Sequence, residues 1–274
     1  MRVAMRRAAH QVFDNPRVLD DPIALPIIGP EAATKLDEEK HRHGHRVAQS
    51  FRAFMAVRSR YAEDEMARSV ARGATQYVVL GAGLDTFAYR NPYRESALRV
   101  FEVDFPATQE WKRQRLASAG ISIPSSVIYA PLDFERQTLP EGLRQAGFDP
   151  KKLTFFSWLG VVMYLTEQTV MSTLGFIASM PPGSGVAFDF AVPRASLNWT
   201  GRLALDALSR RVSAAGEPFQ TFFYPTALAE KLRQMGFHSV ENLGADEINA
   251  RYFKDRNDGL RVRGRIGHLM SAQV

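Results

Sequence analysis

The sequence predicts an α/β protein whose sheet is mostly parallel, with helices on both faces and a helical cap before it. From residue 76 onward, short and almost continuously apolar runs alternate with amphipathic stretches, which is typical of parallel strands buried on both faces. The residues before them have the apolar spacing of helices instead. We therefore expect a helical cap over residues 1–72 and a sheet domain over residues 73–274, joined as one structural unit.

The longest helix is expected from His43 to Arg72, because apolar side chains recur along one of its faces. These side chains are Val47, Phe51, Phe54, Tyr61 and Val70.

Arg58 lies on that apolar face, seven residues after Phe51 and three before Tyr61. A guanidinium without a partner is costly to bury, so Arg58 should meet an anion there. That anion is either a ligand or an interior acid in a structural ion pair. Arg60 faces away from the stripe and is expected to pair with Asp64 on the solvent side.

Five apolar runs are expected to form strands, at residues 77–80, 98–103, 126–129, 153–158 and 185–190. Helices are expected between and after them, at residues 106–119, 139–146, 167–180, 196–214 and 226–235. The chain closes with apolar runs at residues 237–243 and 262–270, with no strong helix pattern between them. These two runs are expected to form an antiparallel pair at or near the edge of the sheet.

The composition is that of an ordinary globular protein, with 45% hydrophobic and 23% charged residues. The absence of cysteine excludes disulfides and thiolate metal ligands. No apolar stretch is long enough to span a membrane, and no apolar core of a signal peptide follows the basic N-terminus. We expect a soluble, cytoplasmic enzyme.

The net charge of +6 and the pI near 9.7 raise the possibility of nucleic-acid binding. Most basic residues are nevertheless scattered among acids. The one concentration, Arg261, Arg263 and Arg265, alternates with small or apolar residues, as the solvated face of a strand does. We therefore expect a small-molecule substrate as the partner, with neither nucleic acid nor membrane.

A glycine-containing loop, Gly81-Ala82-Gly83, directly follows the first expected strand. Glycines at this place allow unusual φ angles and a close approach of the backbone to a ligand. Asp104 ends the next strand, and an acid there can accept both ribose hydroxyls of an adenosine ligand. A plain β-turn followed by a surface acid is the simpler alternative.

A dinucleotide cofactor would use the same loop and acid, but two residues disfavour it. Thr86 stands where the dinucleotide fingerprint has its third small residue, and Pro92 limits the helix that should receive the pyrophosphate. The loop therefore favours a nucleoside cofactor without phosphates.

Several segments, in order and at compatible spacing, resemble the leucine carboxyl methyltransferase family. They are Arg58–Tyr61, Val79–Thr86, Phe101–Pro106 and Ser157–Leu165, with the pair Asp21-Pro22 before them. The resemblance implies a class I methyltransferase fold, which is Rossmann-like, with seven strands of which the last is antiparallel. It also implies S-adenosyl-L-methionine as the cofactor.

The resemblance assigns residues to the cofactor as well. Arg58 would hold the methionyl carboxylate, Gly81 with Ala82 and Gly83 would lie along the methionyl part, and Asp104 would bind the ribose.

Asp133 and Phe134 would flank the adenine, and Arg6 or Arg7 would take a basic position of the cap. The chain departs from the family at Leu159, where many members have a glutamate. The contribution of that acid near the amino group of the cofactor must be absent or come from elsewhere.

We expect an O-methyltransferase that acts on a small-molecule carboxylate or hydroxyl. A carboxylate is nucleophilic at neutral pH, whereas a hydroxyl needs a general base. Tyr164 is the candidate for a substrate-side hydroxyl, as opposed to a packed aromatic. The run Phe219–Tyr224 is either a roof over an apolar or aromatic substrate or simply core.

Two other functions stay open from the sequence: a nicotinamide-dependent oxidoreductase and a non-catalytic nucleoside-binding regulator. No metal site is expected, because the cluster His41, His43 and His45 lacks accompanying carboxylates and is typical of a solvated loop. His10 is expected to have a capping or packing role.

Overall fold

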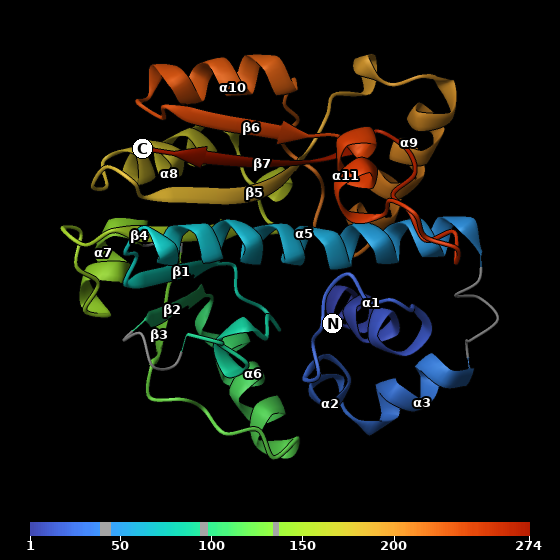
Figure 1. Cartoon of the computed structure of the whole chain (residues 1–274), viewed down its shortest axis with the longest axis horizontal. Coiled ribbons are helices and arrows are strands. Elements are labelled where there is room, and N and C mark those ends of the chain that lie inside the picture. Colours follow the sequence, from blue (N-terminus) through green and yellow to red (C-terminus); the bar gives the residue numbers. More distant parts are fainter. Residues whose placement is uncertain (39–44, 94–97, 134–136) are drawn as a thin grey trace.

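The computed structural model describes residues 1–38, 45–93, 98–133 and 137–274 (Figure 1). Its N-terminal region contains the helices α1 (Arg2–Phe13), α2 (Ala24–Ile28), α3 (Pro30–Glu38) and α5 (Arg46–Ala71). The first three lie together on one side of α5, with α1 packed against both α2 and α5 (Figure 1). The helical prediction for this region is confirmed for its described residues.

The described residues contain one seven-stranded sheet with the order β3-β2-β1-β4-β5-β7-β6. Its strands are β1 (Gln76–Leu80), β2 (Arg99–Asp104), β3 (Val127–Pro131), β4 (Thr154–Trp158), β5 (Gly185–Ala191), β6 (Ser239–Leu243) and β7 (Gly267–Gln273). β7 is antiparallel to both β5 and β6, and the other neighbouring strands are parallel. The mostly parallel sheet and the antiparallel C-terminal pair near its edge are confirmed.

Both faces of the sheet are covered, as the apolar strands predict. All five residues of β1 are buried, and their side chains alternate between two hydrophobic clusters. Tyr77 and Val79 pack with residues of α1, α2 and α5, whereas Val78 and Leu80 face the cluster on the opposite side. The long helix α5 crosses the sheet on the first of these faces (Figure 1).

The remaining helices connect the strands. They are α6 (Pro106–Ser118), α7 (Leu139–Gln145), α8 (Glu167–Ala178), α9 (Trp199–Ser213), α10 (Pro225–Gln234) and α11 (Ala245–Tyr252). Short 3₁₀ turns are η1 (Phe87–Tyr89), η2 (Val162–Tyr164) and η3 (Arg194–Ser196). The turn η1 stands where a dinucleotide-binding fold would place a long helix after the glycine loop.

The helix α11 was not expected between the last two strands. Only Ala245 and Ile248 of its eight residues are buried, so its apolar pattern is too sparse to predict a helix.

The last strand begins later than predicted, at Gly267 instead of residue 262. Residues 262–266 precede β7, and Val262 and Arg263 among them are held by side chains. Asn249 both accepts from the amide of Val262 and donates to its carbonyl, at 2.9 and 2.8 Å, and Ser50 accepts from the amide of Arg263. The predicted strand face of arginines is therefore wrong, although Arg261, Arg263 and Arg265 are solvent-exposed as expected.

The helix α5 packs along β4, β5 and β7, so it links the cap to the sheet domain. A division of the chain at residue 72 stays a prediction. Among the helices of the described ranges, none has the length and apolarity that a membrane crossing requires.

Candidate functional site

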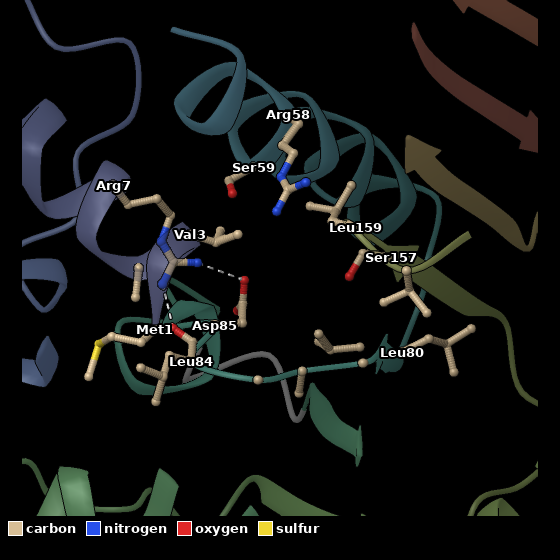
Figure 2. Close-up of a pocket in the computed structure, with 17 residues that line it drawn as sticks. Met1, Val3, Arg7, Arg58, Ser59, Leu80, Leu84, Asp85, Ser157 and Leu159 are labelled. Carbon is tan, nitrogen blue, oxygen red and sulfur yellow. Dashed lines mark hydrogen bonds and ion pairs between the residues drawn. The ribbon is translucent and has the colours of Figure 1, made fainter. Parts of the chain in front are cut away.

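A cavity of about 210 Å³ lies between the cap and the carboxyl ends of β1 and β4. Its walls are residues 79–85 at the end of β1 and after it, residues 157 and 159–161 at the end of β4 and after it, Arg58 and Ser59 of α5, Met1, and Val3, Ala4 and Arg7 of α1. Figure 2 shows Arg7 and Arg58 reaching toward it from two different helices. Open α/β sheets bind their ligands at this edge, so the cavity is the candidate site.

The glycine loop forms the floor of the cavity. The amides of Gly81 and Ala82 both donate to the carbonyl of Val103, at 2.9 and 3.1 Å, which ties the loop to β2. Gly81 has a φ of +68°, and a Cβ at this position would collide with the side chain of Val161. Both the backbone conformation and the available space therefore require glycine here.

Asp104 connects the end of β2 to the same loop. Its Oδ2 accepts from the amide of Gly83 at 2.6 Å, and its Oδ1 accepts from the amide of Phe105 at 2.7 Å. Asp104 is half-buried and does not line the cavity itself, but it lies directly beside the loop that does.

Asp133 follows β3, next to the strand that Asp104 ends. The amide of Leu132 donates to the carbonyl of Asp104 at 2.9 Å, which brings the two strand ends together. The side chain of Asp133 is half-buried. Phe134, the other residue expected beside the adenine, lies outside the described residues.

Arg58 is 6% exposed, which confirms that it points inward with the apolar stripe. Its Nη1 donates to Oδ2 of Asp189 on β5 at 2.9 Å, so it makes an interior ion pair and lines the cavity at once. Its Nε is buried and has no hydrogen-bond partner within the described ranges. Arg60 makes the expected exposed pair with Asp64 at 2.7 Å.

Arg7 is the basic residue of the cap that reaches the cavity, and Arg6 does not line it. The Nη2 of Arg7 donates to the carbonyl of Leu84, and its Nη1 lies 3.5 Å from Oδ2 of Asp85 (Figure 2). Through these contacts α1 is fastened to the glycine loop. The sequence left the choice between Arg6 and Arg7 open.

The buried carboxylate of Asp21 lies behind Arg7. It accepts a hydrogen bond of 2.7 Å from the hydroxyl of Thr86 and lies 3.4 Å from Nε of Arg90 and 3.6 Å from Nε of Arg7. Arg90 continues this network to Glu63 of α5. Thr86, which disfavoured a dinucleotide, is thus a contact between the loop and the cap.

The remaining walls of the cavity are largely apolar. Val3, Leu159 and Val161 face it, and Ser157 accepts a hydrogen bond of 2.8 Å from Tyr77. Leu159, at the place where the resemblance led us to expect a glutamate, therefore adds apolar surface and no charge.

Tyr164 does not line the cavity. Its ring packs against Phe219, with the ring centroids 5.4 Å apart, and burial raises the pKa of its hydroxyl. Phe219 in turn contacts Phe222, and Phe223 is buried against Phe190. Phe219 and Phe222 are half-buried and Tyr224 is exposed, so only part of the aromatic run packs in the core, and none of it lines the described cavity. The role of Tyr164 stays a prediction.

The histidines do not form a site in the described ranges. His10 is fully buried; its Nδ1 lies 2.8 Å from Asp14, and its Nε2 accepts from the amides of Val18 and Leu19. Of the expected capping or packing role, this confirms the packing one. His41 and His43 lie outside the described residues, and the described ones contain no group suited to hold a metal ion.

The cavity offers two arginines, two serines and backbone amides, with one carboxylate, Asp85. The Oδ1 of Asp85 accepts from the amide of Phe87 at 2.9 Å, and Arg7 lies beside its Oδ2. Neither histidine nor lysine is among the described residues that line the cavity. The arrangement suits a ligand with a carboxylate, and the one carboxylate of the cavity is already engaged.

Comparison with known proteins agrees with this geometry. A family model described as leucine carboxyl methyltransferase matches residues 1–178. A protein of Bacillus subtilis strain 168, named as an S-adenosyl-L-methionine-dependent methyltransferase, is 33% identical over 287 residues, which cover 97% of this chain and 94% of the relative. A Mycobacterium tuberculosis H37Rv protein named in the same way is 28% identical, over 91% of this chain and 85% of its own.

Two crystal structures share the fold. A methyltransferase from Thermobifida fusca has a TM-score of 0.58 at 18% identity and covers 99% of this chain and 93% of its own. A Streptomyces avermitilis protein of a family described as DUF574 has a TM-score of 0.52 at 16% identity, over 100% and 97% of the two chains. At such identities the likeness shows the class I methyltransferase fold alone.

Proposed function

Because the chain belongs to the leucine carboxyl methyltransferase family and uses S-adenosyl-L-methionine as its cofactor, we propose that it methylates an oxygen of a small molecule. A carboxylate or a hydroxyl is the acceptor, and the carboxylate is favoured. The observation that carries this preference is that no histidine or lysine is among the described residues that line the cavity, and that its one carboxylate, Asp85, is engaged by Arg7.

We propose that Arg58 binds the methionyl carboxylate of the cofactor. The Nη1 of this arginine is engaged by Asp189, which leaves the edge formed by Nε and Nη2 for a second carboxylate. Arginine binds carboxylates through two parallel hydrogen bonds of this kind. The buried Nε without a partner fits such a ligand.

The other cofactor contacts follow from the order of the strand ends. The loop Gly81-Ala82-Gly83 would lie along the methionyl part, Asp104 would accept from the ribose hydroxyls, and Asp133 would accept from the adenine amino group. The hydrogen bond between Asp104 and the amide of Gly83 supports this placement, because it keeps the acid next to the loop.

When bound, the cofactor supplies a methyl group that its sulfonium already activates. The residues of this chain then have to orient the acceptor oxygen and exclude water, and orientation can contribute about 7–11 kcal/mol. The apolar side chains of Val3, Leu159 and Val161 favour an acceptor that is apolar beside its reacting oxygen. Burial raises the pKa of Tyr164, so its hydroxyl would act as a donor and not as a base.

The test is transfer of labelled methyl from S-adenosyl-L-methionine to a panel of apolar carboxylic acids and phenols. Each product is then treated with mild alkali, which releases methanol from a methyl ester and leaves a methyl ether intact. Alkali-labile label supports the carboxylate preference. Alkali-stable label would assign the hydroxyl instead, and label on nitrogen or carbon would contradict O-methylation altogether.

A further inference from the structure

We infer that Asp189 is a positioning residue of the methyl-transfer site, which fixes the guanidinium of Arg58 for the carboxylate of the cofactor. This inference rests on the proposed role of Arg58. Asp189 itself is 1% exposed and is not part of the cavity wall, so it acts through Arg58 and not on the cofactor.

The carboxylate of Asp189 joins three elements behind the cavity. Its Oδ2 accepts from Nη1 of Arg58 on α5, and its Oδ1 accepts from the amide of Gly160 in the loop after β4, at 2.9 and 2.5 Å. Asp189 stands on β5, where its backbone neighbour across the sheet is Leu269. Both of its oxygens therefore hold groups that line the site.

This contact decides which edge of Arg58 is free. With Nη1 held from behind by Asp189, the edge of Nε and Nη2 is the part that can take an incoming carboxylate. A planar guanidinium recognises a carboxylate well only when its plane is fixed. An ion pair with a buried acid on a central strand supplies that fixation.

Gly160 completes the arrangement. Its φ is +74°, and a Cβ here would come within 2.8 Å of Nη1 and 2.9 Å of Nη2 of Arg58. The guanidinium thus packs directly on the backbone of the loop that Asp189 also holds. A shift of Asp189 would move both at once.

The pairing of Asp189 with Arg58 also satisfies the carboxylate. The residue before Gly160, Leu159, carries no charge. Within the described ranges, Asp189 is the acid that forms an ion pair with Arg58. It occupies the middle of an otherwise apolar strand, where an unpaired carboxylate would be strongly disfavoured.

The test compares two ligands that differ in the carboxylate. S-adenosylhomocysteine carries the amino-acid part, whereas 5′-methylthioadenosine has the adenosine and sulfur without it. Calorimetry gives Kd for both with the wild type, Asp189→Asn, Arg58→Met and the double variant. Asp206→Asn is the matched control, because Asp206 pairs with Arg194 on the surface and does not line the cavity.

We expect Asp189→Asn to raise Kd for S-adenosylhomocysteine by about tenfold to a hundredfold, which corresponds to a weakened hydrogen bond to a charged group. Binding of 5′-methylthioadenosine should change by less than about twofold, as should both affinities of the Asp206→Asn control. In the Arg58→Met background, Asp189→Asn should have no further effect on S-adenosylhomocysteine.

Three results would overturn the inference. Asp189→Asn could weaken the binding of both ligands equally, or it could bind S-adenosylhomocysteine with wild-type affinity. It could also weaken S-adenosylhomocysteine in the Arg58→Met background as much as it does alone. If Asp189→Asn does not fold, Asp189→Glu keeps the charge but displaces the carboxylate. It should weaken S-adenosylhomocysteine selectively, and wild-type affinity in that variant overturns the inference. If Arg58→Met binds both ligands as the wild type does, the assignment of Arg58 fails first. The chemistry of the methylated product has no influence on any of these affinities.

Discussion

The hydroxyl of Thr86 donates a hydrogen bond of 2.7 Å to the carboxylate of Asp21, which lies 65 positions away in the sequence. Both side chains are fully buried. The contact joins the end of the glycine loop to the segment between α1 and α2. The cap and the floor of the cavity are therefore parts of one packed unit, and a substitution in one should alter the stability of the other.

Thr86→Val should destabilise the protein by about 1–3 kcal/mol, because the shape is kept while a buried carboxylate loses its hydroxyl donor. Urea unfolding measures the change. Thr34→Val is the matched control: its hydroxyl bonds to the carbonyl of Pro30 at an exposed position, so it should stay within about 0.5 kcal/mol. Equal stability of the two variants would show that the buried contact contributes nothing.

Asp104→Ala should weaken the binding of S-adenosyl-L-methionine by about tenfold to a hundredfold, since hydrogen bonds to the charged group are lost. The change also removes the acceptor of the Gly83 amide, which holds the loop. Calorimetry gives the affinity, and circular dichroism checks the fold. Asp206→Ala, which removes an exposed carboxylate, should bind as the wild type does. Wild-type affinity of Asp104→Ala would remove Asp104 from the proposed site.

Gly160→Ala should both destabilise the protein and weaken cofactor binding. Alanine is strained at a φ of +74°, at a cost of about 1–3 kcal/mol, and its Cβ would push on the guanidinium of Arg58. Gly175→Ala is the control: it lies within α8, and a Cβ there meets no atom within 4 Å. That variant should gain about 0.4–1 kcal/mol in thermal unfolding and keep its affinity. The prediction fails if both variants behave alike.

The stability should depend on pH through His268. This residue lies on β7, with its Nδ1 3.1 Å from Oδ1 of Asn242, and burial lowers its pKa below the usual 6.5. The native protein then binds fewer protons than the unfolded chain just below that pH. The contribution of His268 to the free energy of unfolding is fully present above about pH 6.5. It is lost as the pH falls from there toward the pKa of His268 in the native protein.

The measurement is the free energy of unfolding in urea at about pH 5.5 and about pH 7.5. His268→Gln removes the titrating group and should make the difference between the two pH values smaller. An unchanged difference in that variant would assign the dependence to other groups.

The sequence allowed the fold to be predicted because its signals are local. A run such as Tyr77–Leu80 is apolar at every position, and this requires cover on both faces whatever the rest of the chain does. The glycine loop and Asp104 follow such runs directly, so the edge of the sheet on which they meet was also predictable. The helix α11 was not predicted, because its own apolar pattern is too weak to indicate a helix.

The side-chain pairings within the site could not be predicted from local signals. Arg58 could be predicted to face an anion, but the choice of Asp189 depends on a contact over 131 positions. One signal could have found it, namely a lone aspartate within the apolar run Gly185–Ala191, which has to be paired when buried.

By itself, the sequence determined the order of the strands and of the helices between them other than α11, the glycine loop and the acids at the strand ends, because periodicity and turn chemistry act over a few residues. The tertiary structure alone decided that Arg7 and not Arg6 reaches the cavity, that Thr86 holds Asp21, and that Asp189 lies behind Arg58. These pairings depend on how the cap packs against the sheet and on the position of β5 within it. That position is set by the packing of the whole core and not by any single segment.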